Sequence, residues 1–213
     1  MLICLLFTCL PLSGQSSTDV YREGLADCLP GDDLRMITEL YTEIDAWTTE
    51  VFRVENPYFT LALRYCTDQL DERFFRVAAG SRLDSLIRSG MQSNLWKRRM
   101  LPGTKDDADV DMIPPGGTVS ARDPATAERV TFDPRSSFIN CSKVYTLHPA
   151  LARIYQRYDV YHVAGSNVKL CALIDYLTAA DYELNSVKYF IALDIVLQRM
   201  LLVNGYGDLL EEG

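Results

Sequence analysis

Apolar side chains recur at three- and four-residue steps along most of this chain, a spacing that gathers them on one face of an α-helix. The clearest stripe lies in residues 33–53, whose opposite face carries acidic side chains. Further stripes predict four more helices: 57–79, 81–99, one from Pro149 to a break at Gly165, and one from Asn167.

The most apolar run outside the N-terminus, residues 182–205, predicts the helix around which the others pack. Its polar side chains gather on one narrow side, and the rest of its circumference is apolar. Those polar residues are Lys188, Asp194, Gln198 and Arg199. Because they interrupt the run, we expect a central helix of a bundle and no transmembrane span.

Capping residues mark where these helices begin and end. The residues expected at helix N-termini are Asp32 or Asp33, Asn56 before Pro57, Ser81 with Asp84 as in a capping box, and Asp181. Asn204–Gly205 supplies a C-terminal stop for the central helix.

Residues 101–137 lack the helical periodicity and hold Pro-Gly turns and an acidic run. Two short pieces within them, Thr118–Ser120 and Arg129–Phe132, can pair as a β-hairpin. A connection of this length in a compact domain is usually functional. We therefore expect a partner protein to bind at residues 101–137.

Together these patterns predict a mostly α fold of about six helices in one helical-bundle-like domain, residues 17–213. An N-terminal helical unit covers 33–99, a long loop with its β-hairpin covers 100–137, and a C-terminal helical unit covers 138–213. The two units should share one core, because the central helix needs more apolar cover than its sequence neighbours can give.

Residues 1–16 have the character of a signal peptide. The apolar run Leu2–Leu12 is too short to span a bilayer, and small and polar residues follow at Gly14–Ser16, although no basic residue precedes the run. The alternative is a retained apolar arm that docks on the fold or on a partner. Cleavage would make the protein secreted or lumenal, whereas retention would make it intracellular or particle-associated.

Cysteine usage also favours export. Cys4 and Cys9 would leave with a signal peptide, and the remaining even number suits two disulfides in an oxidising compartment. Those remaining cysteines are Cys28, Cys66, Cys141 and Cys171. All three pairings are open, and free thiols on apolar helix faces are the alternative for Cys66 and Cys171.

Composition and motifs exclude several functions. A net charge of −8 and a pI near 4.8 argue against nucleic-acid binding. The sequence has no phosphate-binding glycine loop, CxxC pair or HExxH motif, so we predict no cofactor or metal site. Residues 107–111 begin like an EF-hand loop, but Met112 and Thr118 occupy the positions that need Gly and Glu.

The two histidines are few for an enzyme. His148 precedes Pro149, where its ring can cap backbone N–H groups or lie at the surface, and His162 suits a partly buried structural position. A nucleophile pair of Cys141 and a histidine lacks local support and fails if Cys141 is oxidised. We therefore predict no catalytic residue.

Two short features are candidates for surface chemistry. Asn140-Cys141-Ser142 is an N-glycosylation sequon, so Asn140 can carry a glycan in an exported protein. The only local basic patch is expected at a helix C-terminus, where it complements the helix dipole or binds an acidic partner or lipid head group. Its residues are Trp96, Lys97, Arg98 and Arg99.

Three functions stay open from the sequence. The favoured one is a non-catalytic, exported protein-interaction or assembly protein, with a homo-oligomer among its candidate states. A carrier of a small apolar ligand predicts a pocket lined by Phe190, Leu173 and Tyr155. An enzyme without a readable motif predicts a cleft that brings His148 or His162 near Cys141, Asp175 or Asp194.

Overall fold

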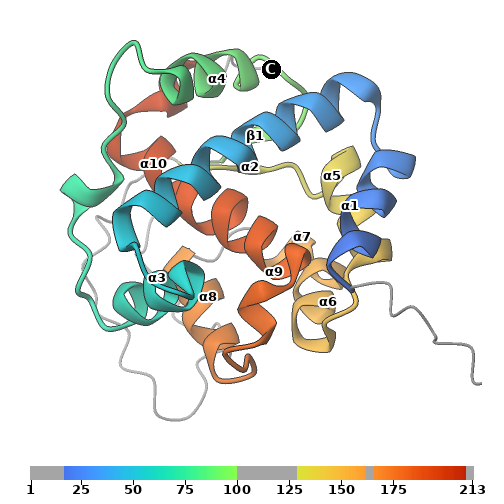
Figure 1. Ribbon diagram of the computed structural model, residues 1–213. Coiled ribbons are helices and arrows are strands. Elements are labelled where there is room, and N and C mark those ends of the chain that lie inside the picture. Colours follow the sequence, from blue (N-terminus) through green and yellow to red (C-terminus); the bar gives the residue numbers. More distant parts are fainter. Residues whose placement is uncertain (1–16, 100–128, 162–165, 210–213) are drawn as a thin grey trace, which may run out of the picture.

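The computed structural model describes residues 17–99, 129–161 and 166–209. These residues are mostly helical, with one two-stranded antiparallel β-ribbon among them, which confirms the predicted fold class (Figure 1). The elements up to the ribbon are α1 (Ser17–Cys28), α2 (Gly31–Phe52), α3 (Pro57–Cys66), the 3₁₀ turn η1 (Glu72–Phe75), α4 (Arg82–Gly90), β1 (Trp96–Arg99) and β2 (Arg129–Phe132). Those after it are α5 (Ser137–Tyr145), α6 (Pro149–Gln156), α7 (Tyr158–Tyr161), α8 (Ser166–Ile174), η2 (Asp181–Glu183), α9 (Asn185–Tyr189), the π-helix η3 (Phe190–Leu197), α10 (Gln198–Val203) and η4 (Tyr206–Leu209).

The predicted central helix consists of α9, η3 and α10 in direct succession, and it crosses the middle of the molecule (Figure 1). Every residue of η3 is buried, and η3 contacts α2 and α8 as well as its own continuations. The helix begins at Asn185 rather than Tyr182, because Asp181 does not cap it. Instead the Asp181 carboxylate accepts hydrogen bonds of 2.7 Å from the backbone N–H and the hydroxyl of Thr178, which fixes the preceding turn.

Helix α2 matches its predicted range within two residues and contacts both η3 and α4, and its Ile37, Leu40 and Ile44 are fully buried. Neither predicted aspartate caps it, since the N-cap residue is Pro30. Both aspartates lie in the first turn, where negative charge is favourable.

The second and third predicted helices are shorter than expected. Asn56 caps α3 as predicted, by accepting the N–H of Phe59 at 3.0 Å, but α3 ends at Cys66 and Asp68 follows in the left-handed conformation, φ 56°. Ser81 also caps α4 as predicted. The chain then leaves the helical conformation after Gly90 and enters a strand.

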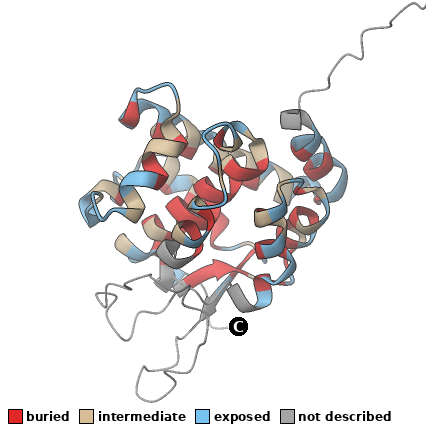
Figure 2. Cartoon of the chain, turned by 90° about the horizontal axis from the view of Figure 1, so that it is seen from below, coloured by how far each residue is buried: buried red, intermediate tan, exposed pale blue. Residues whose placement is uncertain are grey.

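That strand, β1, pairs with β2 in antiparallel register, with Trp96 opposite Phe132. The two rings stack at 4.1 Å and are almost fully buried, so the ribbon closes one side of the core, and Figure 2 shows the buried colour on the β2 arrow. The prediction of a strand at Arg129–Phe132 is correct, but its described partner is β1. Thr118–Ser120, the partner predicted from the sequence, lies outside the described residues.

The buried carboxylate of Asp84 joins α4 to η4. Asp84 accepts hydrogen bonds from the hydroxyl of Tyr206 at 2.6 Å, the N–H of Gly80 at 2.9 Å and Arg88 Nε at 3.0 Å. The bond from Tyr206, followed by those from Gly80 and Arg88, holds the pKa of Asp84 below its usual value. Burial raises the pKa of Tyr206 to about 12, so this hydroxyl remains a donor at neutral pH.

Because its pKa is lowered in the folded state, Asp84 should stabilise the fold above the unfolded-state pKa of about 4 and lose that contribution as the pH falls through its folded-state pKa. The stability gap between the native protein and Asp84→Asn should therefore be larger at pH 6 than at pH 3. Urea denaturation at both values measures this gap. The exposed Asp32→Asn serves as the control and should change less, and an Asp84→Asn gap independent of pH would contradict the expectation.

Candidate functional site

All four cysteines that follow residue 16 are paired in the structure. Cys28 on α1 is joined to Cys141 on α5, and Cys66 on α3 is joined to Cys171 on α8. Each crosslink ties a helix that precedes residue 100 to one that follows residue 137. The free-thiol interpretation is therefore wrong, and Cys141 cannot act as a nucleophile.

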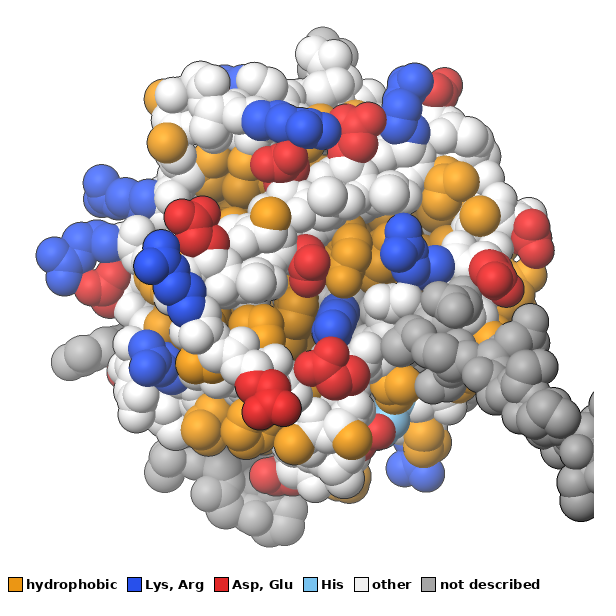
Figure 3. Space-filling model, viewed as in Figure 1, with side chains coloured by type: hydrophobic (Ala, Val, Ile, Leu, Met, Phe, Trp, Pro, Cys, Tyr) orange, Lys and Arg blue, Asp and Glu red, His pale blue; other side chains and the backbone are white. Residues whose placement is uncertain are grey.

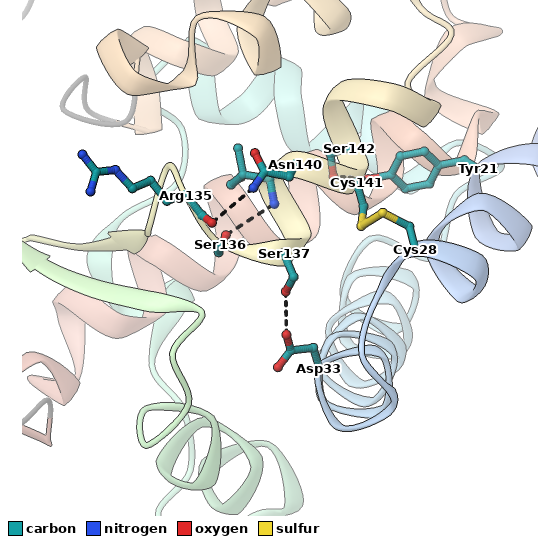
Figure 4. Close-up of a disulfide and its surroundings, with 10 residues drawn as sticks. Tyr21, Cys28, Asp33, Arg135, Ser136, Ser137, Asn140, Cys141 and Ser142 are labelled. Atoms are coloured by element: carbon teal, nitrogen blue, oxygen red, sulfur yellow. Dashed lines mark hydrogen bonds between the residues drawn. A yellow bond between two sulfur atoms is a disulfide. The ribbon is translucent and has the colours of Figure 1, made fainter.

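The first crosslink lies among hydrogen bonds that fasten α5 to α1 and α2 (Figure 4). The Tyr21 hydroxyl and Ser142 Oγ are 2.8 Å apart, and Ser137 donates to Asp33 at 2.5 Å. Burial raises the pKa of Tyr21 above its ordinary value. The phenol thus stays protonated at physiological pH, and the hydrogen bonds of this cluster hold α5 against α1 and α2.

A second polar cluster lies wholly inside the core, where α7 and α8 meet the central helix. Lys169 Nζ is 3.0 Å from both carboxylate oxygens of Asp194, and Tyr158 donates to the same carboxylate at 2.5 Å. Gln198 also donates to Asp194, and its side-chain oxygen accepts from Lys169 at 3.2 Å. The Lys169 and Asp194 side chains are 0% and 1% exposed, so this cluster is closed to solvent. Its hydrogen bonds hold α7 and α8 against the central helix.

Only half of this cluster is predictable from the sequence pattern. Asp194 and Gln198 were expected on a polar side of the central helix together with Lys188 and Arg199, and Lys169 was not singled out. A local feature of the sequence could have identified Lys169, because this lysine interrupts an apolar run next to Leu170. A lysine in an apolar helical stripe needs a buried counter-charge, and an aspartate on the central helix supplies it.

The side chain of His148 does not cap a helix, contrary to one interpretation from the sequence, and it is mostly buried. It is the N-cap residue of α6, but its side chain makes no capping hydrogen bond and is only 10% exposed. Its Nε2 lies 3.8 Å from Asp181 Oδ2. His162 lies outside the described residues.

The most exposed apolar side chains near a concavity lie where α5 turns into α6. Val144 is 68% exposed and Leu147 is 63% exposed. Together with Tyr145 we call these residues the apolar corner. A hollow of about 240 Å³ lies beside it, lined by Tyr21, Tyr145, Leu147, His148, Pro149, Leu184 and Ser186.

A glycine shapes one wall of this hollow. A Cβ atom at Gly24 of α1 would lie 2.2 Å from Cδ1 of Tyr145, closer than real carbon atoms approach. Only a glycine at this position lets the Tyr145 ring lie directly on the backbone of α1. Helices α1 and α5 are in extensive contact, so the corner is part of a fixed framework.

The predicted basic patch has a different setting from the one expected. Trp96 is buried, and Lys97 Nζ lies 3.6 Å from Asp133 Oδ2. Arg98 and Arg99 belong to β1, and only their backbone is described. The four residues therefore alternate across a strand, and the helix-dipole interpretation is wrong because no helix ends there.

Asn140 of the sequon is exposed on α5, and its Nδ2 donates to the carbonyl of Arg135 at 3.2 Å (Figure 4). Glycosylation of Asn140 stays a prediction, and so does partner binding at residues 101–137, most of which lie outside the described residues.

On the face shown in Figure 3, basic and acidic side chains are interspersed with apolar surface, so neither positive nor negative charge dominates this face.

Two features are absent from the described residues. No helix there is both long and apolar enough to cross a bilayer. Residues 17–99, 129–161 and 166–209 also contain no group of three or more His, Cys, Asp or Glu side chains placed to hold a metal ion. Comparison with known proteins identified no matching family model, curated protein or solved structure.

Proposed function

We propose that this chain is an exported, disulfide-crosslinked helical protein that acts without catalysis, by binding another protein through the apolar corner. The observation that carries the proposal is the exposure of Leu147, which lines a hollow with aromatic walls, and of Val144, three positions before it. Single exposed apolar residues are ordinary on protein surfaces. Two exposed apolar residues within four positions of each other, at the edge of a concavity, resemble the apolar centre of a protein interface.

Export is supported by the crosslinks. Disulfides persist in oxidising compartments and are rare in reducing ones, and here all four cysteines after residue 16 are paired. The signal-peptide character of residues 1–16 and the exposed Asn140 agree with that location. A retained N-terminal arm, with an intracellular or particle-bound location, is the alternative.

The carrier function has less support than the interaction function. Phe190, Leu173 and Tyr155, expected to line a ligand pocket, are at most 2% exposed and pack within the core. They do not line the hollow at the apolar corner. The hollow at the apolar corner is also smaller than most small-molecule sites, which are about 300–1,000 Å³.

Mass spectrometry of the protein purified from its native host tests the export part. The expected mass lacks the first 16 residues, decreases on glycosidase treatment, and increases by two hydrogens for each disulfide on reduction. An unprocessed mass with free thiols would contradict export.

Site-specific photo-crosslinking tests the binding part. A photoreactive aromatic residue at Leu147 should capture a defined extracellular protein, whereas the same residue at Tyr176, which is similarly exposed at 69%, should not. With that protein purified, Leu147→Asp should weaken binding at least about tenfold, since burying a charge in an apolar contact costs more than 1.4 kcal/mol. Equal capture at both positions, or unchanged affinity of Leu147→Asp, would contradict the proposal.

A further inference from the structure

A second and larger hollow, of about 570 Å³, lies between the β-ribbon, α5 and the junction of α6 with α7. Its volume is within the range typical of small-molecule sites. In contrast to the apolar corner, its lining is largely polar. The lining residues are Lys97, Asp133, Pro134, Arg135, Asn140, Lys143, Gln156 and Asp159.

The charges in this hollow are incompletely paired. Lys97 lies 3.6 Å from Asp133, so these two largely neutralise each other. The side chains of Arg135, Lys143 and Asp159 make no ion pair or hydrogen bond within the described part of the chain. The three cations of the lining exceed its two carboxylates by one positive charge, in a chain whose net charge is −8.

The backbone at the edge of the hollow is fixed before any ligand binds. The N–H of Arg135 donates to Asp133 Oδ1 at 2.9 Å, and the carbonyl of Arg135 accepts from Asn140 at 3.2 Å. Figure 4 shows the Arg135 side chain extending away from the disulfide. Asn140 and Lys143, three residues apart on α5, share one helix face. The hollow therefore presents donors and acceptors from a preorganised frame.

We propose that this hollow binds a saccharide that carries a single acidic group. Sugar hydroxyls both donate and accept, and the amides of Asn140 and Gln156 offer both functions while Asp159 accepts. Arg135 and Lys143 can donate to the one carboxylate in charge-assisted hydrogen bonds. A polyanion such as a polyphosphate fits less well, because Asp133 and Asp159 would face its additional charges.

Such a saccharide can come from two sources. It can belong to another molecule, such as a partner glycoprotein, or it can be the glycan attached to Asn140, which lies in the wall of the hollow. Attachment would form a bond between Nδ2 of Asn140 and the anomeric carbon of a sugar and break the bond of that carbon to a lipid-pyrophosphate donor, which releases the lipid pyrophosphate and the displaced Nδ2 proton. The saccharide site does not depend on the apolar corner, so either proposal can fail while the other holds.

The test uses unglycosylated protein made in an oxidising bacterial periplasm, titrated with 3′-sialyllactose and, as the neutral matched ligand, lactose. In nuclear magnetic resonance spectra, sialyllactose should shift the resonances of residues that line the hollow. It should bind at least about tenfold more tightly than lactose, and added salt should weaken sialyllactose binding. Arg135→Gln and Lys143→Gln should each reduce the affinity several-fold. Lys188→Gln, whose lysine pairs with Glu183 elsewhere, should leave the affinity unchanged.

Protein from a glycosylating host separates the two sources. If the glycosylated protein binds sialyllactose as tightly as the unglycosylated protein does, the saccharide comes from another molecule. If glycosylation of Asn140 abolishes sialyllactose binding, the chain's own glycan occupies the hollow. The proposal is overturned if the unglycosylated protein binds neither sugar, if it binds both equally, or if Arg135→Gln and Lys143→Gln have no effect.

Discussion

Replacing the Cys66–Cys171 crosslink by Cys66→Ala/Cys171→Ala should lower the free energy of unfolding by about 3–5 kcal/mol. The crosslink joins residues 105 positions apart, and a closed loop of about this length removes a large conformational entropy from the unfolded chain. Urea denaturation without reductant, compared with the native protein, measures the loss.

The Cys28–Cys141 crosslink is a matched control for loop length. It spans 113 residues, so the entropic part of its stabilisation should be nearly the same. Cys141 is 1% exposed but its partner Cys28 is exposed, whereas Cys66 and Cys171 are both partly buried, so the packing losses of the two double variants should also be similar. A loss below about 1 kcal/mol for either double variant would argue that the unfolded chain is already constrained in other ways.

Lys169→Met should lower the free energy of unfolding by about 3–5 kcal/mol, a second large effect. Methionine preserves much of the length of the side chain but removes the ammonium group that lies 3.0 Å from both Asp194 oxygens. The carboxylate then stays buried without that counter-charge, and the desolvation of its charge is no longer offset. Chemical denaturation at neutral pH measures the loss.

A double-mutant cycle shows whether the charge is the cause. Adding Asp194→Asn to Lys169→Met should recover at least half of the lost stability, because a neutral amide can still accept from Tyr158. Lys188→Met is the control, since the Lys188–Glu183 pair is partly exposed and should contribute less than about 1 kcal/mol. Losses that simply add for Lys169→Met and Asp194→Asn would show that the two side chains do not act as a pair.

The sequence predicted the best-defined helices well because their signals are local. The stripe in residues 33–53 became α2, and the apolar run after residue 182 became the buried central helix. The caps at Asn56 and Ser81 were also correct, since a cap involves only residues three positions apart.

The sequence failed where a distant contact overrode a local pattern. Apolar spacing continued beyond Cys66, yet the chain turns there, and Phe74 of η1 packs instead against Trp47 and Phe52 of α2. The predicted helix 81–99 likewise includes Trp96 in its last turn, but Trp96 stacks on Phe132, which is 36 positions later in the chain. Such long-range pairings leave no trace in a short window of sequence.

The sequence by itself determined the helical class, the identity of the central helix and the even set of cysteines after residue 16. It predicted Asn140 as a candidate for glycosylation on the sequon alone. These properties depend on residue types and on spacings of a few positions, which set local conformation and local chemistry.

Only the tertiary structure decided which cysteines are paired, that Lys169 meets Asp194, and where the two hollows lie. The two pairings depend on residues 25 and 113 positions apart coming within contact distance, and the hollow at the apolar corner is lined by residues as distant in sequence as Tyr21 and Ser186. Helical periodicity specifies which face of a helix is buried, but not which neighbour covers it. The choice of neighbour follows from the simultaneous packing of all side chains in the core.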